Sequence, residues 1–132
     1  MGKAAGMKSE WFFCDLLRAK GIAYIFENDW YDFLVKGTYK VELKSCQISI
    51  QKDCRRGYSI GRFDFTNEDN LKQAIKENIW IGLVVRHQDQ FIMYGFIKAE
   101  KLKNRKRYLT IHQARDLKPL SFEDWILELY GE

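Results

Sequence analysis

The feature that most constrains the fold is an apolar run over residues 79–85, which contains no polar or charged side chain. A run of this length fits one β-strand, and a strand that is apolar at every position is typical of a sheet covered on both faces. Helices are the usual cover for such a sheet. The run therefore predicts a β-sheet that packs between helices.

The flanking segments supply the other elements. Apolar residues recur at helical spacing over 9–19, with Ser9 as the expected N-cap, and a second helix is expected over 66–78. A loop and a short strand fill 51–65, and Ser121 is expected to cap a C-terminal helix. Strands are predicted over 22–26, 31–35, 39–50, 79–85, 91–97 and 108–111. The order helix, three strands, helix, two or three strands, helix predicts an α/β fold with a central mixed β-sheet flanked by helices.

The composition fits one domain over residues 1–132. No apolar run approaches the roughly 20 residues that span a membrane. Three cysteines without a CxxC pair argue against a disulfide framework, and no apolar leader is visible, so we predict a cytoplasmic protein without a membrane partner. His87 and His112 lie far apart and have no closely spaced cysteine, so no zinc site is expected.

Basic residues cluster in two stretches of a chain whose net charge is only +4. Residues 98–107 include six basic side chains against Glu100, and residues 52–62 include four against Asp53. Such clusters are typical of surfaces that bind phosphates, although a solvated loop is the alternative for each. The residues expected to contact nucleic acid are Arg55, Arg56, Arg62, Lys101, Lys103, Arg105, Lys106 and Arg107.

Two acids and a lysine lie within the predicted hairpin. Side chains alternate along a strand, so Glu42 and Lys44 share one face. The turn decides where Asp32 lies on the preceding strand. A two-residue loop would pair Asp32 with Val41, whereas a three-residue loop, or a bulge, would bring it beside Glu42. The sequence leaves both registers open.

Carboxylates that meet at a strand edge repel each other, and a divalent cation removes that cost. Mg²⁺ prefers oxygen ligands and keeps waters that can attack a phosphodiester, while a nearby lysine can orient the water or stabilise charge on the phosphate. Glu10 is a further candidate, because helical spacing puts it on the same face as Phe13 and Leu17. Two alternatives remain: Glu10 as an exposed first-turn acid near the helix dipole, and the hairpin acids as a solvated charged face.

Glu10, Asp32 and the tripeptide Glu42-Leu43-Lys44 resemble the metal site of the PD-(D/E)XK nuclease superfamily. The order of elements resembles the restriction-endonuclease-like core of that superfamily. The segment around the tripeptide is similar to archaeal Holliday-junction resolvases and to related archaeal and viral nucleases.

This resemblance implies a Mg²⁺-dependent endonuclease, with Mn²⁺ able to substitute, that hydrolyses DNA phosphodiester bonds. It implies that Asp32, Glu42 and the backbone carbonyl of Leu43 ligate the metal, that Glu10 contacts the metal or a bound water, and that Lys44 assists the attacking water. Branched or structured DNA, a homodimer and an archaeal or archaeal-viral source are further implications.

The chain departs from the superfamily pattern in two places. Tyr31 stands where the name-giving motif has proline, and the segment between Gln47 and Phe65 is an insertion. Gln47 itself is a candidate auxiliary polar residue beyond the motif.

Three functions are therefore compared below. The first is the metal-dependent endonuclease. The second is a nucleic-acid-binding module without catalysis, which predicts salt-sensitive binding that needs no metal. The third is a structural or interaction protein, in which the 15% aromatic residues only fill a core or a dimer interface.

Overall fold

The computed structural model describes residues 2–53, 57–105 and 107–131, and the side chains of 8–48, 61–105 and 107–131. Its elements in chain order are α1 (Gly2–Ala19), β1 (Tyr24–Phe26), β2 (Phe33–Val35), β3 (Tyr39–Gln47), β4 (Ser49–Asp53), β5 (Gly57–Ile60), β6 (Arg62–Asp64), α2 (Glu68–Glu77), β7 (Trp80–His87), β8 (Gln90–Lys98), the 3₁₀ helix η1 (Ala99–Leu102), β9 (Tyr108–Thr110), α3 (Ile111–Asp116) and α4 (Phe122–Gly131).

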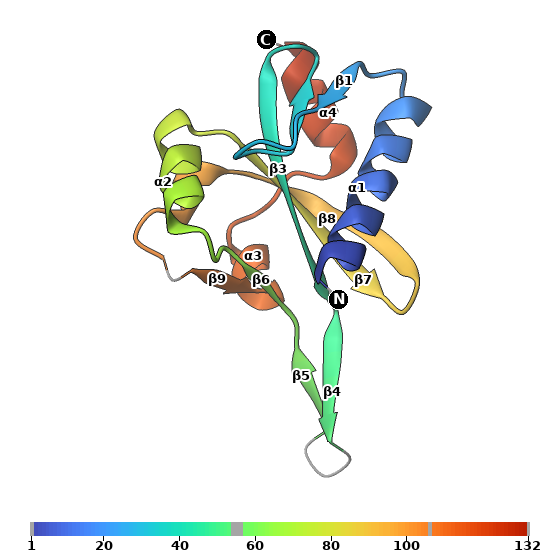
Figure 1. The fold of residues 1–132 in the computed structure, drawn as a ribbon, viewed down its shortest axis with the longest axis vertical. Helices are drawn as coiled ribbons and strands as arrows, with labels where there is room; N and C mark the ends of the chain where they lie inside the picture. The colour runs from blue at the N-terminus through green and yellow to red at the C-terminus, as the bar shows by residue number, and fades with distance from the viewer. Residues whose placement is uncertain (1, 54–56, 106, 132) are drawn as a thin grey trace.

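Five strands form the central sheet in the order β1-β2-β3-β7-β8 (Figure 1). β3 and β7 are parallel, whereas the other neighbouring strands are antiparallel. Two small antiparallel pairs, β4–β5 and β6–β9, lie outside this sheet. The prediction of an α/β fold with a mixed sheet is confirmed at this level.

Helices cover both faces of the sheet. On one face, α1 and α4 pack against the sheet through a set of buried side chains that we call the α1/α4 core. Its largest members are Phe13, Phe33, Phe96, Leu17 and Trp125. On the other face the α2/α3 core includes residues of α2, α3, β6 and β9, namely Ala74, Ala114, Phe63 and Leu109. β7 is buried from Trp80 to Val85, because its side chains enter both cores. This accounts for its unbroken apolar sequence.

The first helix is longer than predicted, and Ser9 is not its N-cap. α1 begins at Gly2, so Ser9 lies in the middle of the helix and is 2% exposed. The residues between them include Ala4, Ala5 and Met7, which favour helix and extend it beyond the apolar pattern.

The turn between β2 and β3 settles the register of the hairpin. Val35 pairs with Tyr39, which leaves the three-residue loop Lys36-Gly37-Thr38. Lys36 and Gly37 adopt positive φ angles of 55° and 69°, a conformation that glycine accepts easily. Regular pairing ends at Phe33 and Val41, and the Asp32 backbone N–H donates to the Val41 carbonyl, so the ladder becomes irregular at Asp32.

Residues 49–61 differ from the predicted continuous strand and loop. β3 ends at Gln47, and β4 and β5 form a separate hairpin that projects from the body of the molecule (Figure 1). A Cβ on Gly61 would lie 1.6 Å from the backbone oxygen of Gln47, so only glycine lets the chain return this closely beneath β3.

The C-terminal part contains one predicted and one unpredicted helix. Ser121 accepts a hydrogen bond from the Asp124 backbone N–H at 3.1 Å, which confirms its capping role for α4. α3 was not predicted, although Thr110 and Gln113 form its capping box. Among the described residues, the helices are too short or too polar to cross a membrane.

Candidate metal centre and nucleic-acid surface

Glu42 and Lys44 lie side by side on β3, on the face that carries the α2/α3 core. Their neighbours Val41 and Leu43 point to the opposite face and pack in the α1/α4 core, as strand alternation predicts. Glu42 is 9% exposed, and its Oε2 is 3.9 Å from Lys44 Nζ. The ammonium group also lies 5.5 Å from the ring centre of Phe65, so the pair is enclosed between strand and core.

Asp32 is held at the point where the β2–β3 ladder ends. Its backbone N–H donates to the Val41 carbonyl at 3.1 Å. Its Oδ2 accepts a hydrogen bond from the Leu43 backbone N–H at 2.7 Å. The side chain therefore replaces the backbone acceptor that a longer β2 would supply, and it lies against the edge of β3 beside Glu42.

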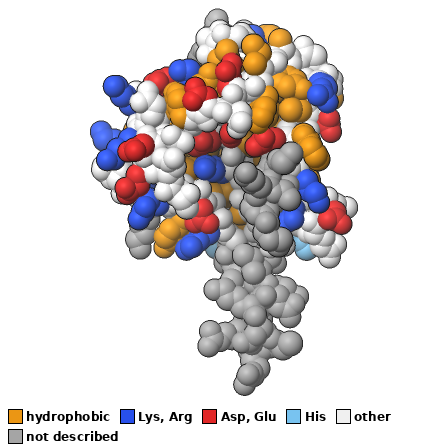
Figure 2. Space-filling model, viewed as in Figure 1, with side chains coloured by type: hydrophobic (Ala, Val, Ile, Leu, Met, Phe, Trp, Pro, Cys, Tyr) orange, Lys and Arg blue, Asp and Glu red, His pale blue; other side chains and the backbone are white. Residues whose placement is uncertain are grey.

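Glu10 reaches this site from α1. It is half-buried in the third turn of a helix that starts at Gly2, so the alternative of an exposed first-turn acid is wrong. Burial raises the pKa of Glu10, and repulsion from Asp32 raises it further. The second cause shows that the two carboxylates are close enough to interact. On the face seen in Figure 2, acidic side chains gather in the middle, where the sheet lies between α1 and α2.

All three carboxyls of the site have raised pKa values, and burial is the main cause for each. The pKa of Glu42 rises from 4.5 to about 7, because burial and repulsion from Asp32 outweigh the attraction of Lys44. The pKa of Asp32 is also raised, although the Leu43 N–H and Lys44 oppose the effect of burial. One lysine does not compensate three partly buried acids, so this site favours an additional cation or protons.

The donor set suits a hard divalent cation. Carboxylate oxygens from Glu10, Asp32 and Glu42 are the ligands that Mg²⁺ prefers. In a strand the N–H and C=O of one residue point to the same side, so the Leu43 carbonyl faces the side on which its N–H meets Asp32. Among the described residues, no three His, Cys, Asp or Glu side chains are close enough to hold a metal ion.

Two of the predicted basic residues lie at the small β6–β9 sheet, next to which Phe65 lies over Lys44. Arg62 lies on β6, where its Nε is 3.2 Å from Asp64 Oδ1 and its guanidinium is 4.5 Å from the Tyr108 ring centre. Arg107 accepts a backbone hydrogen bond from Phe65 at 2.7 Å. Its side chain reaches to 3.7 Å from Glu68 Oε1. Both arginines are exposed, and such surface pairs contribute little, so phosphate oxygens can replace their partners at small cost.

The other predicted basic residues lie further from the site or outside the described residues. Lys101 Nζ donates to the Leu117 carbonyl at 2.8 Å, and Arg105 Nε donates to the Lys101 carbonyl at 3.2 Å, so both stabilise the loop that carries them. Lys103 is exposed. The remaining candidates, Arg55, Arg56 and Lys106, lie outside the described residues.

Two further side chains near the end of β3 bear on the site. Strand alternation puts Gln47 on the face opposite Glu42 and Lys44. Cys46 shares their face, and burial together with repulsion from Asp64 raises the pKa of its thiol to about 12, which makes it a poor metal ligand.

Sequence reasoning missed Lys40, the third residue of the polar stripe on β3. The signal was present, because residues 40, 42 and 44 alternate onto one face. Lys40 contacts Glu77 of α2 and the rings of Trp30 and Tyr31, which precede Asp32.

Comparison of the chain with protein-family models, with curated proteins and with solved structures finds no match.

Proposed function

We propose that this protein is a Mg²⁺-dependent endonuclease that hydrolyses DNA phosphodiester bonds on a restriction-endonuclease-like core. One observation carries the proposal: at the end of the β2–β3 ladder the partly buried Asp32 interacts with Glu10 on one side and with the Glu42–Lys44 pair on the other, and all three carboxyls have raised pKa values. Such a cluster is unfavourable for a purely structural role, because charged groups are rarely buried without sufficient partners.

In this proposal Asp32, Glu42 and the Leu43 carbonyl hold the metal, with Mn²⁺ able to substitute, and Glu10 contacts it or a bound water. The metal would supply Lewis acidity and a water of lowered pKa. The Leu43 N–H fixes the Asp32 carboxylate, which leaves its other oxygen for ligation. Lys44 orients the attacking water and stabilises negative charge that develops on the phosphate.

The basic surface would place the substrate. The Arg107 backbone is bonded to Phe65, whose ring lies next to Lys44, so Arg107 would bind a phosphate close to the cleaved bond. Arg62, on β6 and against Tyr108, would bind a neighbouring phosphate. Lys101, Lys103 and Arg105 would contact the duplex further away. We also propose a homodimer, an intracellular site of action and branched DNA as a substrate class, which are the expectations that follow from the sequence resemblance.

A non-catalytic nucleic-acid-binding module is the second candidate. It is favoured by one observation: among the described residues, the carboxylates do not lie close enough together to hold a metal ion. This alternative predicts DNA binding that is unaffected by EDTA and no cleavage by the unmodified protein.

A cleavage panel distinguishes the two. Labelled linear duplex, single-stranded, flap and four-way-junction DNAs are incubated with Mg²⁺ or EDTA and with wild type, Asp32→Asn, Glu42→Gln or Lys44→Met. Glu128→Gln, an exposed acid on α4, is the matched control. We expect cleavage that requires Mg²⁺ and that only the three site variants lose. Retained cleavage in all three variants would refute the nuclease proposal, and metal-independent binding without cleavage would establish the binding module.

A further inference from the structure

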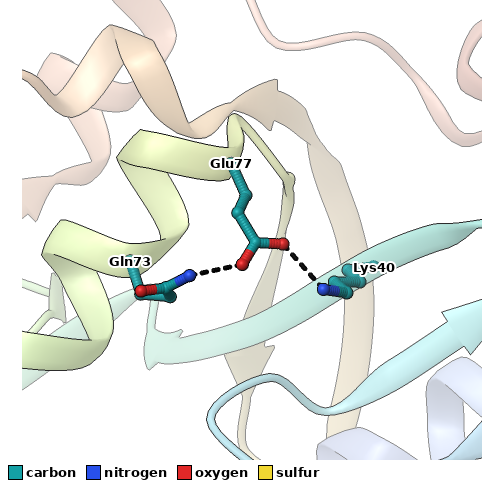
Figure 3. A network of polar contacts seen from close by, with 3 residues as sticks. All are labelled: Lys40, Gln73 and Glu77. Atoms are coloured by element: carbon teal, nitrogen blue, oxygen red, sulfur yellow. Dashed lines mark hydrogen bonds and ion pairs between the residues drawn. The ribbon is translucent and has the colours of Figure 1, made fainter.

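Lys40 links the C-terminal end of α2 to the central sheet. Its Nζ is 2.6 Å from Oε1 of Glu77, in the last turn of α2. The other carboxylate oxygen of Glu77 accepts a hydrogen bond from Nε2 of Gln73, one turn earlier (Figure 3). Gln73 and Lys40 therefore hold the carboxylate from two sides, so the position of the ammonium group is defined by α2.

The same ammonium group contacts the residues that precede Asp32. Lys40 Nζ lies 5.1 Å from the ring centre of Trp30 and 5.3 Å from that of Tyr31. The two rings meet edge to face, with their centres 5.1 Å apart. Tyr31 is only 8% exposed, so its ring is also fixed by the α2/α3 core. Lys40 thus adds a cation–π contact to an aromatic pair that is already packed.

The loop that carries Asp32 depends on such contacts for its position. Regular pairing of β2 with β3 ends at Phe33. Before it, the chain turns at Asn28, with φ of 51°, and the Glu27 N–H donates to the Asp32 carbonyl at 2.9 Å. Asp32 itself is tied to β3 by its backbone N–H, which donates to the Val41 carbonyl, and by its Oδ2, which accepts from the Leu43 N–H. The residues before it, Trp30 and Tyr31, meet Lys40 of β3 through their side chains.

We propose that Lys40 is a positioning residue for the metal-ligating carboxylate of Asp32. The path runs from Glu77 on α2 through Lys40 to Trp30 and Tyr31, and Tyr31 is bonded directly to Asp32. This inference rests on the proposed function, because it assumes that the position of Asp32 matters for metal binding. Outer residues that orient metal ligands affect metal affinity or activity by about 10- to 100-fold when they are replaced.

The test compares Lys40→Met, which keeps the length of the side chain and removes its charge, with Lys40→Arg and with Glu77→Gln. Lys72→Met, an exposed lysine on α2, is the control. The affinity for Mn²⁺ is measured by electron paramagnetic resonance well below the midpoint of thermal unfolding, together with the Mg²⁺ concentration that gives half-maximal cleavage. We expect affinity about 10-fold weaker for Lys40→Met and weaker for Glu77→Gln. Lys40→Arg and the control should stay within about twofold of wild type, since Arg keeps the charge and the cation–π contact.

Each outcome separates the two proposals. Wild-type Mn²⁺ affinity in Lys40→Met, even with a lower unfolding temperature, would show a structural role only and would overturn the inference while leaving the nuclease proposal intact. A wild-type protein that binds no Mn²⁺ would refute the proposed function itself.

Discussion

Burial of Glu42 has a measurable effect on stability that does not depend on catalysis. In the metal-free protein its carboxyl keeps its proton up to about pH 7, because burial disfavours the charge more than Lys44 favours it. Replacing Glu42 by Gln keeps a neutral side chain of the same shape. We therefore expect Glu42→Gln to be more stable than wild type at pH 8 and nearly equal to it at pH 4.

The magnitude follows from the pKa. Glu42 titrates at about 7 in the folded chain, against an ordinary value of 4.5. The folded protein binds more protons than the unfolded chain between these values, so the wild-type free energy of unfolding falls as the pH rises from about 4.5 to about 7. At about 1.36 kcal/mol per pH unit, an interval of about 2.5 units corresponds to about 3 kcal/mol. The attraction of Lys44 is already included in this figure, because it lowers the pKa from which the figure is worked, so we expect a gain of about 3 kcal/mol at pH 8.

Urea unfolding followed by circular dichroism in EDTA, at several pH values from 4 to 8, gives this difference directly. The exposed acid Glu128 supplies a control variant, Glu128→Gln, for which no comparable pH-dependent gain is expected. Added Mg²⁺ at 100 times its Kd should stabilise wild type by about 2.7 kcal/mol and should stabilise Glu42→Gln much less. A stability difference that is the same at every pH, or a variant less stable than wild type at pH 8, would refute the reasoning.

Three further changes have defined outcomes. Lys44→Met should lower kcat for DNA cleavage by about 10²- to 10³-fold and leave Mg²⁺ affinity almost unchanged, as steady-state kinetics and calorimetry would show. Gly61→Ala should cost more than about 3 kcal/mol in urea unfolding, because its Cβ would meet the Gln47 backbone oxygen; unchanged stability would contradict that contact. The double variant Arg62→Gln, Arg107→Gln should weaken DNA binding and lower the slope of log K against log salt by about 2, and an unchanged slope would show that these arginines do not contact phosphates.

The sequence predicts the general architecture because its strongest patterns show which faces of each strand are buried by tertiary packing. The run over 79–85 is apolar at every position, and the structure buries β7 on both faces. Alternation at Glu42 and Lys44 predicts their shared face for the same reason. In contrast, the predicted start of α1 is wrong, since Ser9 has the chemistry of an N-cap and outweighs the helix propensity of Ala4, Ala5 and Met7 before it.

The register at Asp32 could not be predicted, because both loop lengths are compatible with Lys36-Gly37-Thr38. The structure selects the three-residue loop, and distant contacts favour it: Lys36 Nζ and Tyr39 Oη each lie 3.3 Å from the Leu129 carbonyl near the end of α4. The end of β3 at Gln47 likewise depends on the close approach of Gly61, a contact between residues that are separated in sequence.

Isothermal titration of the metal-free protein with Mn²⁺ at pH 7 tests the central claim most directly, which is that Asp32 and Glu42 form one metal site beside Lys44. We predict one ion bound per chain, release of protons as the raised carboxyl pKa values fall, and loss of binding in Asp32→Asn and in Glu42→Gln but not in Lys44→Met. Binding of equal affinity in wild type and in both carboxylate variants, or no binding by wild type, would contradict the account.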